Sequence, residues 1–209
     1  MAKLAKYRRV IISGLSGTGK SELACQILDK ARDSETYKGF FWLSAARKPN
    51  IQAGIYEMAR ELKLLADSHM DTENIRRLVL NELSKQDHWL MVLDNVDDID
   101  LIKDFMPSRR GIRHVLITTR YRDAHLQQAI NGNSVELIDM TQDEATLLFK
   151  EYSDENQENT DGNEISSLVE MLGFLPLAII QAAAYIRESQ GTILTFIEIY
   201  QQMRERLAK

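Results

Sequence analysis

The sequence is poor in residues that cross-link a chain, and it contains no long apolar run. Its 209 residues include a single cysteine, Cys25, and three prolines. One cysteine excludes an internal disulfide and is typical of a reducing compartment. No apolar stretch reaches the roughly 18 residues of a membrane-spanning helix, and the basic N-terminus precedes a strand-length run, not a signal-peptide core. We therefore expect a cytoplasmic protein without a membrane span, in which Cys25 is a small packing residue.

The sequence also lacks an excess of positive charge. The formal net charge is −5, and 44 % of the residues are hydrophobic, which is enough for a core. This balance gives no electrostatic reason to bind nucleic acid or an anionic membrane, so we expect neither as a partner. The four histidines are isolated in the sequence, and no metal site is expected beyond one for Mg²⁺.

A glycine-rich loop between an apolar run and a helix-forming stretch is the most informative motif. Residues 14–21 read GLSGTGKS and match G-x-x-x-x-G-K-[ST], the P-loop. Its backbone N–H groups surround phosphates, because glycines permit close approach, and the next helix adds its positive dipole end. We expect Lys20 to bind the β and γ phosphates and Ser21 to coordinate Mg²⁺. The nucleotide-binding residues predicted in this segment are Gly14, Leu15, Ser16, Gly17, Thr18, Gly19, Lys20, Ser21 and Glu22.

Apolar segments of strand length alternate with segments of helical periodicity over most of the chain. The predicted strands are 8–13, 39–44, 89–94, 115–120 and 135–140. Runs that are apolar throughout and end in polar residues are typical of a parallel sheet covered on both faces, with the site at its carboxyl edge. We therefore predict a three-layer α/β domain over residues 1–140.

Residues 141–209 change character and predict a small all-helical domain. Thr141 and Glu144 have the spacing of a capping box, and Pro176 suits the first position of a helix. Thr195 and Glu198 repeat the capping pattern before the last predicted helix. The acidic segment 153–163 predicts a loop.

One strand end is expected to complete the metal site. Asp94 follows five apolar residues and is expected to reach the Mg²⁺ beside Ser21. Asn95 comes next, and an amide cannot act as a general base. Asp97 and Asp98 have two interpretations, since either could orient a water or cap a helix.

A second strand end carries Thr118, Thr119 and Arg120, which are expected to sense the γ-phosphate. A guanidinium can donate two parallel hydrogen bonds to a phosphate, and Arg120 is therefore a candidate binding and catalytic residue. Lys20 and Asp94 complete the catalytic candidates. A nearby basic segment is either the lid of a phosphotransferase or a solvated charge run, which we favour; it contains Arg109, Arg110 and Arg113.

Together these motifs resemble the NB-ARC family of signalling ATPases, within the STAND class of regulatory P-loop proteins. The resemblance covers most of the chain. GLSGTGKSELA is similar to the family's P-loop, FFWLSA to its second strand, LMVLDNVDD to its acidic strand and HVLITTR to its arginine sensor strand. LGFLPLAIIQAAAYI resembles the G-L-P-L-A helix start, in wording most similar to fungal members.

The resemblance implies a sheet of order 2-3-4-1-5 and places Pro176 on or near the adenine. It implies a switch in which ADP holds a closed monomer and ATP favours an open oligomer. It also implies an effector domain before this module, sensor repeats after it, and a role in immunity or regulated cell death. The sequence departs from the family at Ser16, Ser21 and Asn95, where a second aspartate is common. The short leader and the missing winged-helix domain lead us to expect an excised fragment or a naturally minimal protein.

We therefore expect a module that binds ATP or ADP with Mg²⁺ and is at most a slow ATPase. Two alternatives stay open, a P-loop kinase of a small molecule and an AAA+-like ATPase. The L-P-L-A helix favours the switch, and no acceptor pocket or basic face with interleaved aromatics supports the alternatives.

The P-loop assignment predicts that Lys20→Ala lowers ATP affinity at least tenfold. A charge-assisted contact contributes about 1.5–3 kcal/mol, and removing the ammonium leaves phosphate charge poorly matched. Calorimetric titration with ATP measures the effect, and an unchanged affinity would contradict the assignment.

Overall fold

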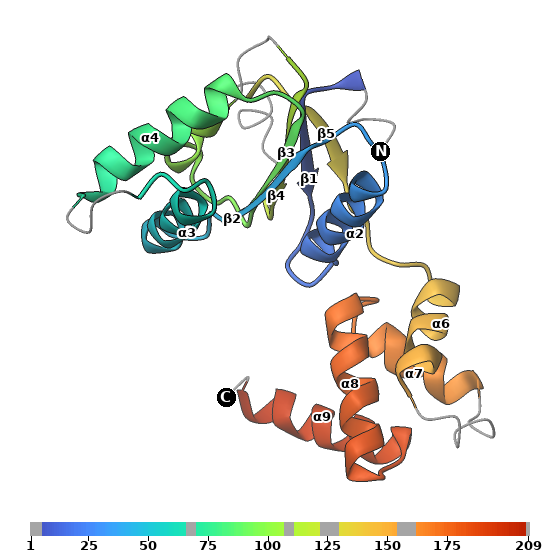
Figure 1. Ribbon diagram of the computed structural model, residues 1–209. Helices are drawn as coiled ribbons and strands as arrows, with labels where there is room; N and C mark the ends of the chain where they lie inside the picture. The colour runs from blue at the N-terminus through green and yellow to red at the C-terminus, as the bar shows by residue number, and fades with distance from the viewer. Residues whose placement is uncertain (1–5, 66–69, 107–110, 122–129, 154–161, 208–209) are drawn as a thin grey trace. The chain divides into compact units, whose positions relative to one another are not determined.

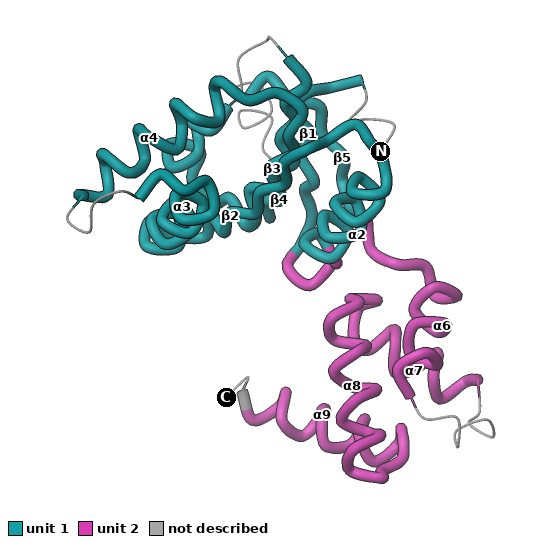
Figure 2. The backbone as a smooth tube through the Cα atoms, in the orientation of Figure 1, with its two compact units in different colours: residues 1–15, 20–137 teal, residues 16–19, 138–209 magenta. Residues whose placement is uncertain are grey.

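The computed structural model describes residues 6–65, 70–106, 111–121, 130–153 and 162–207. The chain forms two compact units, drawn in different colours in Figure 2. Residues 1–15 and 20–137 belong to the first unit, and residues 16–19 and 138–209 to the second. These units are defined by contacts, so the domain boundary predicted after residue 140 stays a prediction.

A five-stranded parallel sheet organises the first unit (Figure 1). Its order is β2-β3-β4-β1-β5, and every neighbouring pair is parallel. The order implied by the family resemblance is therefore confirmed. The strands are β1 (Arg9–Ser13), β2 (Gly39–Ser44), β3 (Trp89–Asp94), β4 (Arg113–Thr119) and β5 (Asn133–Glu136).

Helices cover both faces of this sheet, which gives the predicted three layers. Val10 and Ile12 of β1 pack in the cluster of α2 (Lys20–Arg32). Ile11, between them, packs in the cluster of α3 (Lys48–Glu61) and α4 (Thr72–Lys85). Successive side chains of a strand point to opposite faces, so an apolar run is buried on both sides.

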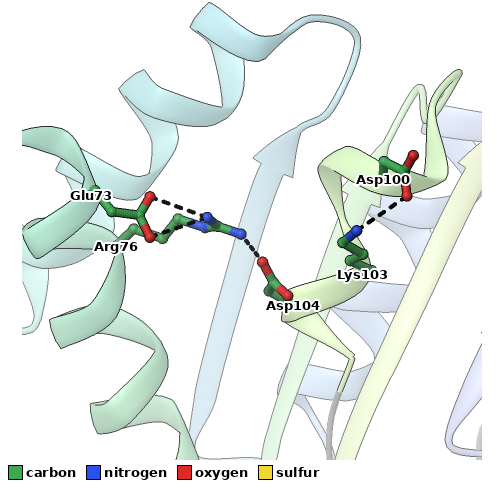
Figure 3. Close-up of polar contacts among 5 residues, drawn as sticks. All are labelled: Glu73, Arg76, Asp100, Lys103 and Asp104. Carbon is green, nitrogen blue, oxygen red and sulfur yellow. Dashed lines mark hydrogen bonds and ion pairs between the residues drawn. The ribbon is translucent and has the colours of Figure 1, made fainter.

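Polar contacts fix the start of α4 and connect it to the segment after β3. Asp71 caps α4 by accepting a hydrogen bond from the Asn74 N–H at 2.8 Å. Figure 3 shows Arg76 of α4 paired with Glu73 at 3.2 Å and with Asp104 of the short helix η2 (Lys103–Phe105). The preceding turn η1 (Ile99–Leu101) is joined to η2 by an ion pair between Asp100 and Lys103.

Two sequence-based expectations about the first unit are wrong in detail. The fifth strand ends at Glu136, although 135–140 was expected. The Leu137 N–H still donates to the Ser13 carbonyl at 2.7 Å, but Ile138 is 77 % exposed, so the apolar run leaves the sheet. Cys25 is exposed and is not a packing residue, because Ala24 and Leu28 form the buried stripe of α2.

The second unit contains the helices α6 (Gln142–Tyr152), α7 (Gly162–Met171), α8 (Pro176–Ser189) and α9 (Ile193–Leu207). They share an apolar cluster that includes Phe149, Leu168 and Ile179. The capping box of Thr141 and Glu144 is confirmed, and Pro176 is the first residue of α8. Most of the predicted loop 153–163 lies outside the described residues.

The last helix begins earlier than its predicted cap. Thr192, not Thr195, stands at its start, and the Thr192 hydroxyl accepts the Thr195 N–H at 3.2 Å. Thr195 therefore lies inside the first turn of α9. Within the described ranges, no helix has the length and apolar character needed to cross a bilayer.

A half-buried histidine in β4 makes the stability of the first unit depend on pH. The Tyr37 hydroxyl lies 2.8 Å from His114 Nδ1. Burial, and secondarily the charge of Arg8, lowers the pKa of His114 from its ordinary value of 6.5. The folded state therefore disfavours the protonated ring. Folding becomes less favourable as the pH falls through the pKa that His114 has in the unfolded chain.

We predict that the free energy of unfolding is lower at pH 5.5 than at pH 7.5, and that His114→Gln weakens this dependence. Glutamine keeps a donor and an acceptor for the Tyr37 hydroxyl but does not titrate. Urea denaturation at the two pH values measures the difference. Hydrogen bonds lower the pKa values of Glu82 and Glu144. Their contributions to the free energy of unfolding are lost only below about pH 4.5, the ordinary pKa of a glutamate, and so do not change between pH 5.5 and 7.5. If the free energy of unfolding changes equally with pH in the variant and in the native chain, the assignment to His114 is contradicted.

Candidate functional site

Three strands end at one edge of the sheet and supply the candidate site of the first unit. β1 leads into the glycine-rich loop and α2, β3 ends at Asp94, and β4 ends at Thr119. β4 lies between β1 and β3 in the sheet. In parallel sheets, ligands bind at the carboxyl ends of the strands, so the polar residues at this edge are the candidates.

The glycine-rich loop requires its glycines for backbone conformation. Gly17 and Gly19 have φ angles of +83° and +86°, which side chains strongly disfavour. The Gly17 carbonyl accepts a hydrogen bond from the Leu177 N–H at 3.2 Å, and a Cβ on Gly17 would lie 3.5 Å from the Leu177 Cβ. Both residues belong to the second unit. Sequence reasoning missed this contact of Leu177. The signal was available, because the first N–H groups of a helix have no partner within the helix and must bond elsewhere.

Lys20 lies across the start of the loop. Its Nζ donates a hydrogen bond to the Leu15 carbonyl at 2.5 Å. Burial lowers the pKa of Lys20, and the negative charge of Asp94 opposes that effect. The ammonium is held by a neutral carbonyl, so an anion that offered charge-assisted contacts would be a stronger partner.

The structure brings Ser21 and Asp94 together, as the sequence predicts. The Ser21 hydroxyl donates to Asp94 Oδ1 at 2.7 Å. The Thr118 hydroxyl donates to the same oxygen at 2.6 Å and accepts the Asn95 N–H at 2.8 Å. One carboxylate oxygen thus connects the start of α2 with the ends of β3 and β4.

The donor set formed by Ser21 and Asp94 fits Mg²⁺. A hydroxyl and a carboxylate are hard oxygen ligands, and Mg²⁺ commonly takes one or two carboxylates and completes its shell with water and phosphate oxygens. Among the described residues, no group of three or more histidine, cysteine, aspartate or glutamate side chains could hold another metal.

The end of β4 carries the three residues that are expected to sense the γ-phosphate, Thr118, Thr119 and Arg120. Thr118 and Thr119 are 1 % and 0 % exposed. The Thr119 hydroxyl accepts the Tyr121 N–H at 3.1 Å. These hydroxyls therefore serve contacts inside the protein, while the Arg120 side chain is 53 % exposed.

The two aspartates after Asn95 have different roles. Asp98 accepts the Asp100 N–H at 2.9 Å and caps η1, so the capping interpretation is confirmed for this residue. Asp97 instead forms an ion pair with Arg120, with Oδ2 and Nη2 at 2.9 Å. Arg120 also lies 5.3 Å from the ring centroid of Tyr121.

The other candidate residues have mixed outcomes. Arg113 is not in a loop, because it begins β4 and donates to the carbonyls of Ser84 at 2.7 Å and Gln86 at 2.8 Å. This removes it from the predicted basic segment, whose other members, Arg109 and Arg110, lie outside the described residues. Glu22 accepts a hydrogen bond from Gln26, and a contact of Pro176 with a base stays a prediction.

Comparison with known protein families decides the membership of the chain. The model of the NB-ARC domain matches residues 2–159, well over half of the sequence. The chain belongs to the NB-ARC family. Membership agrees with the loop, the acidic strand end and the strand order described above.

Relatives of this NB-ARC chain are much longer proteins. A nucleotide-binding leucine-rich repeat (NLR)-like protein of Hyaloscypha variabilis is 29 % identical over 93 % of this chain, which spans 21 % of that protein. The regulatory protein AfsR of Streptomyces coelicolor is 27 % identical over 83 % of the chain and 17 % of its own length. Disease resistance RPP8-like protein 3 of Arabidopsis thaliana is 27 % identical over 86 % of the chain and 20 % of its own length. The chain thus spans about a fifth of each relative.

Solved structures are similar to this NB-ARC chain in fold. Cdc6p of Pyrobaculum aerophilum superposes with a TM-score of 0.62 at 16 % identity, covering 88 % of this chain and 57 % of that one. A Walker-type ATPase of Pyrococcus abyssi superposes with a TM-score of 0.60 at 14 % identity, covering 99 % of this chain and 70 % of that one. At such identities the likeness shows the P-loop NTPase fold alone.

We predict that Thr118→Val lowers the free energy of unfolding by about 1–3 kcal/mol, the cost of leaving a polar partner unsatisfied. Valine keeps the shape but removes the donor to Asp94 and the acceptor for the Asn95 N–H. The matched control Thr118→Ser keeps the hydroxyl. Urea denaturation measures both variants, and a valine variant as stable as the serine variant would show that the hydroxyl does not fix this edge.

Proposed function

We propose that this NB-ARC chain is a nucleotide-dependent switch module of a longer signalling protein. It binds ADP or ATP with Mg²⁺ and hydrolyses ATP slowly. The observation that carries the proposal is the convergence of Ser21 and Asp94 beside Lys20, within a chain of the NB-ARC family. Disease-resistance relatives support a place in immunity. The family resemblance adds regulated cell death, and the single cysteine supports the cytoplasm as a reducing compartment.

Each residue of the P-loop edge has a role in this proposal. The N–H groups of residues 14–22 surround the phosphates, and Lys20 exchanges the Leu15 carbonyl for the β and γ phosphates. Ser21 and Asp94 hold Mg²⁺, which supplies charge neutralisation on the phosphate oxygens when it is bound. Thr118 keeps Asp94 oriented, and Arg120 binds the γ-phosphate.

Slow hydrolysis follows from the residue after Asp94. Rapid hydrolysis needs a group that orients water and accepts its proton. Asn95 can orient a water but cannot take its proton. Asp97, the nearby alternative, already pairs with Arg120. A bound nucleotide therefore persists, which is what a switch requires.

The nucleotide would control assembly in the longer protein. In this proposal ADP favours a closed monomer and ATP an open oligomer, with effector and sensor-repeat domains outside this chain. Pro176 would pack on or near the adenine and so connect α8 to the base. These features come from the family resemblance.

Identification of a released nucleotide tests the proposal directly. The purified protein is denatured, and the supernatant is analysed by chromatography. Retained ADP at near-equal stoichiometry supports the switch. An empty protein that also fails to bind added ADP or ATP would overturn it.

We further predict a turnover below about 1 per second for the isolated chain, under the usual enzyme range, and faster hydrolysis by Asn95→Asp. The backbone of Asn95 has φ +57°, which aspartate also tolerates, so ADP affinity should be nearly unchanged. Phosphate release measures both proteins. If the native chain turns over several ATP per second without a partner, the switch proposal is wrong and the protein is an ordinary enzyme.

A further inference from the structure

Asp97 is a partly buried carboxylate placed against the predicted γ-phosphate sensor. Its side chain is 26 % exposed, and Oδ2 pairs with Arg120. The other oxygen, Oδ1, is buried and has no hydrogen-bond partner among the described residues. Arg120 is therefore the one neutralising contact that the described part of the chain gives this carboxylate.

The backbone holds Asp97 in place. The turn after β3 is attached to the end of β4 by two hydrogen bonds from its N–H groups. Asn95 donates to the Thr118 hydroxyl and Val96 to the Thr118 carbonyl, each at 2.8 Å. Val96 is buried at 1 % exposure. The carboxylate is thus fixed by its turn, whereas the long, half-exposed Arg120 side chain is the partner that can move.

We propose that Asp97 sets the preference of this module between ADP and ATP by competing with the γ-phosphate for Arg120. The inference rests on the proposed function, in which Arg120 binds that phosphate. A carboxylate and a phosphate seek the same guanidinium donors, and the two anions repel each other when both are close to it. Both effects disfavour ATP, whereas ADP lacks the group that competes.

The competition is graded. The Arg120 side chain of this ion pair is 53 % exposed, and ion pairs open to water contribute little, so Asp97 does not block ATP but shifts the balance toward ADP. Asp97 thereby stabilises the resting state of the switch without touching the nucleotide. It acts as a positioning residue, through Arg120.

The test compares the affinities of ADP and a non-hydrolysable ATP analogue, each with Mg²⁺, by calorimetry. For Asp97→Asn we expect the ratio of analogue affinity to ADP affinity to rise about two- to fivefold, the range that an ion pair partly open to water allows. The matched control is Asp100→Asn, which removes the same charge from the same segment. The Asp100 side chain is 77 % exposed, and in Figure 3 its contact is the ion pair with Lys103. The control should leave the ratio unchanged.

A double-mutant cycle separates this role from a structural one. In the Arg120→Ala background, Asp97→Asn should no longer change the ratio, because the residue for which the anions compete is gone. If the asparagine variant folds poorly by circular dichroism, Asp97→Ser removes the charge with a smaller polar group. A ratio that falls or stays constant on loss of the charge overturns the inference, as does an effect that persists without Arg120.

Failure of this inference and failure of the proposed function give different results. A native chain that binds both nucleotides, with a ratio insensitive to Asp97, overturns the inference alone. A native chain that binds neither nucleotide overturns the proposed function and the inference together.

Discussion

One carboxylate oxygen holds the candidate site together. Asp94 Oδ1 accepts hydrogen bonds from the hydroxyls of Ser21 and Thr118, which belong to different elements of the chain. The Thr118 hydroxyl in turn fixes the turn after β3 through the Asn95 N–H. This atom therefore connects the helix after the loop with the ends of β3 and β4, and through Thr118 it is linked to the turn that carries Asp97. Asp94 lies at the carboxyl edge of the sheet, where a carboxylate is a suitable ligand for Mg²⁺.

The sequence predicted well those features that are local. The P-loop is contiguous, and its loop and helix follow from glycine geometry and helix-forming residues around Lys20. Asp94 could be recognised because five apolar residues followed by an acid place a carboxylate at the end of a buried strand. The strand order, by contrast, came from the family resemblance, since no periodicity reveals which strands are neighbours.

Long-range pairing could not be read from the chain. Arg113 looked like part of a basic loop, yet its guanidinium is satisfied by carbonyls 27 and 29 residues away. The pairing of Arg120 with Asp97 depends on two strands lying side by side and on a turn fixed to one of them. The fifth strand was placed too late because an apolar run does not reveal which of its residues reach the sheet. Cys25 was misjudged because residue type is a weak guide to the face of a helix.

The left-handed backbone at residue 95 has an evolutionary consequence. A φ of +57° admits glycine, asparagine and aspartate far more readily than any other residue. The codons for asparagine and aspartate differ at one base, so the amide and the acid are mutational neighbours at a position whose backbone suits both. If Asn95 limits hydrolysis as proposed, one point mutation at this position would reset the lifetime of a bound nucleotide, without any rearrangement of the strands, the loop or the core.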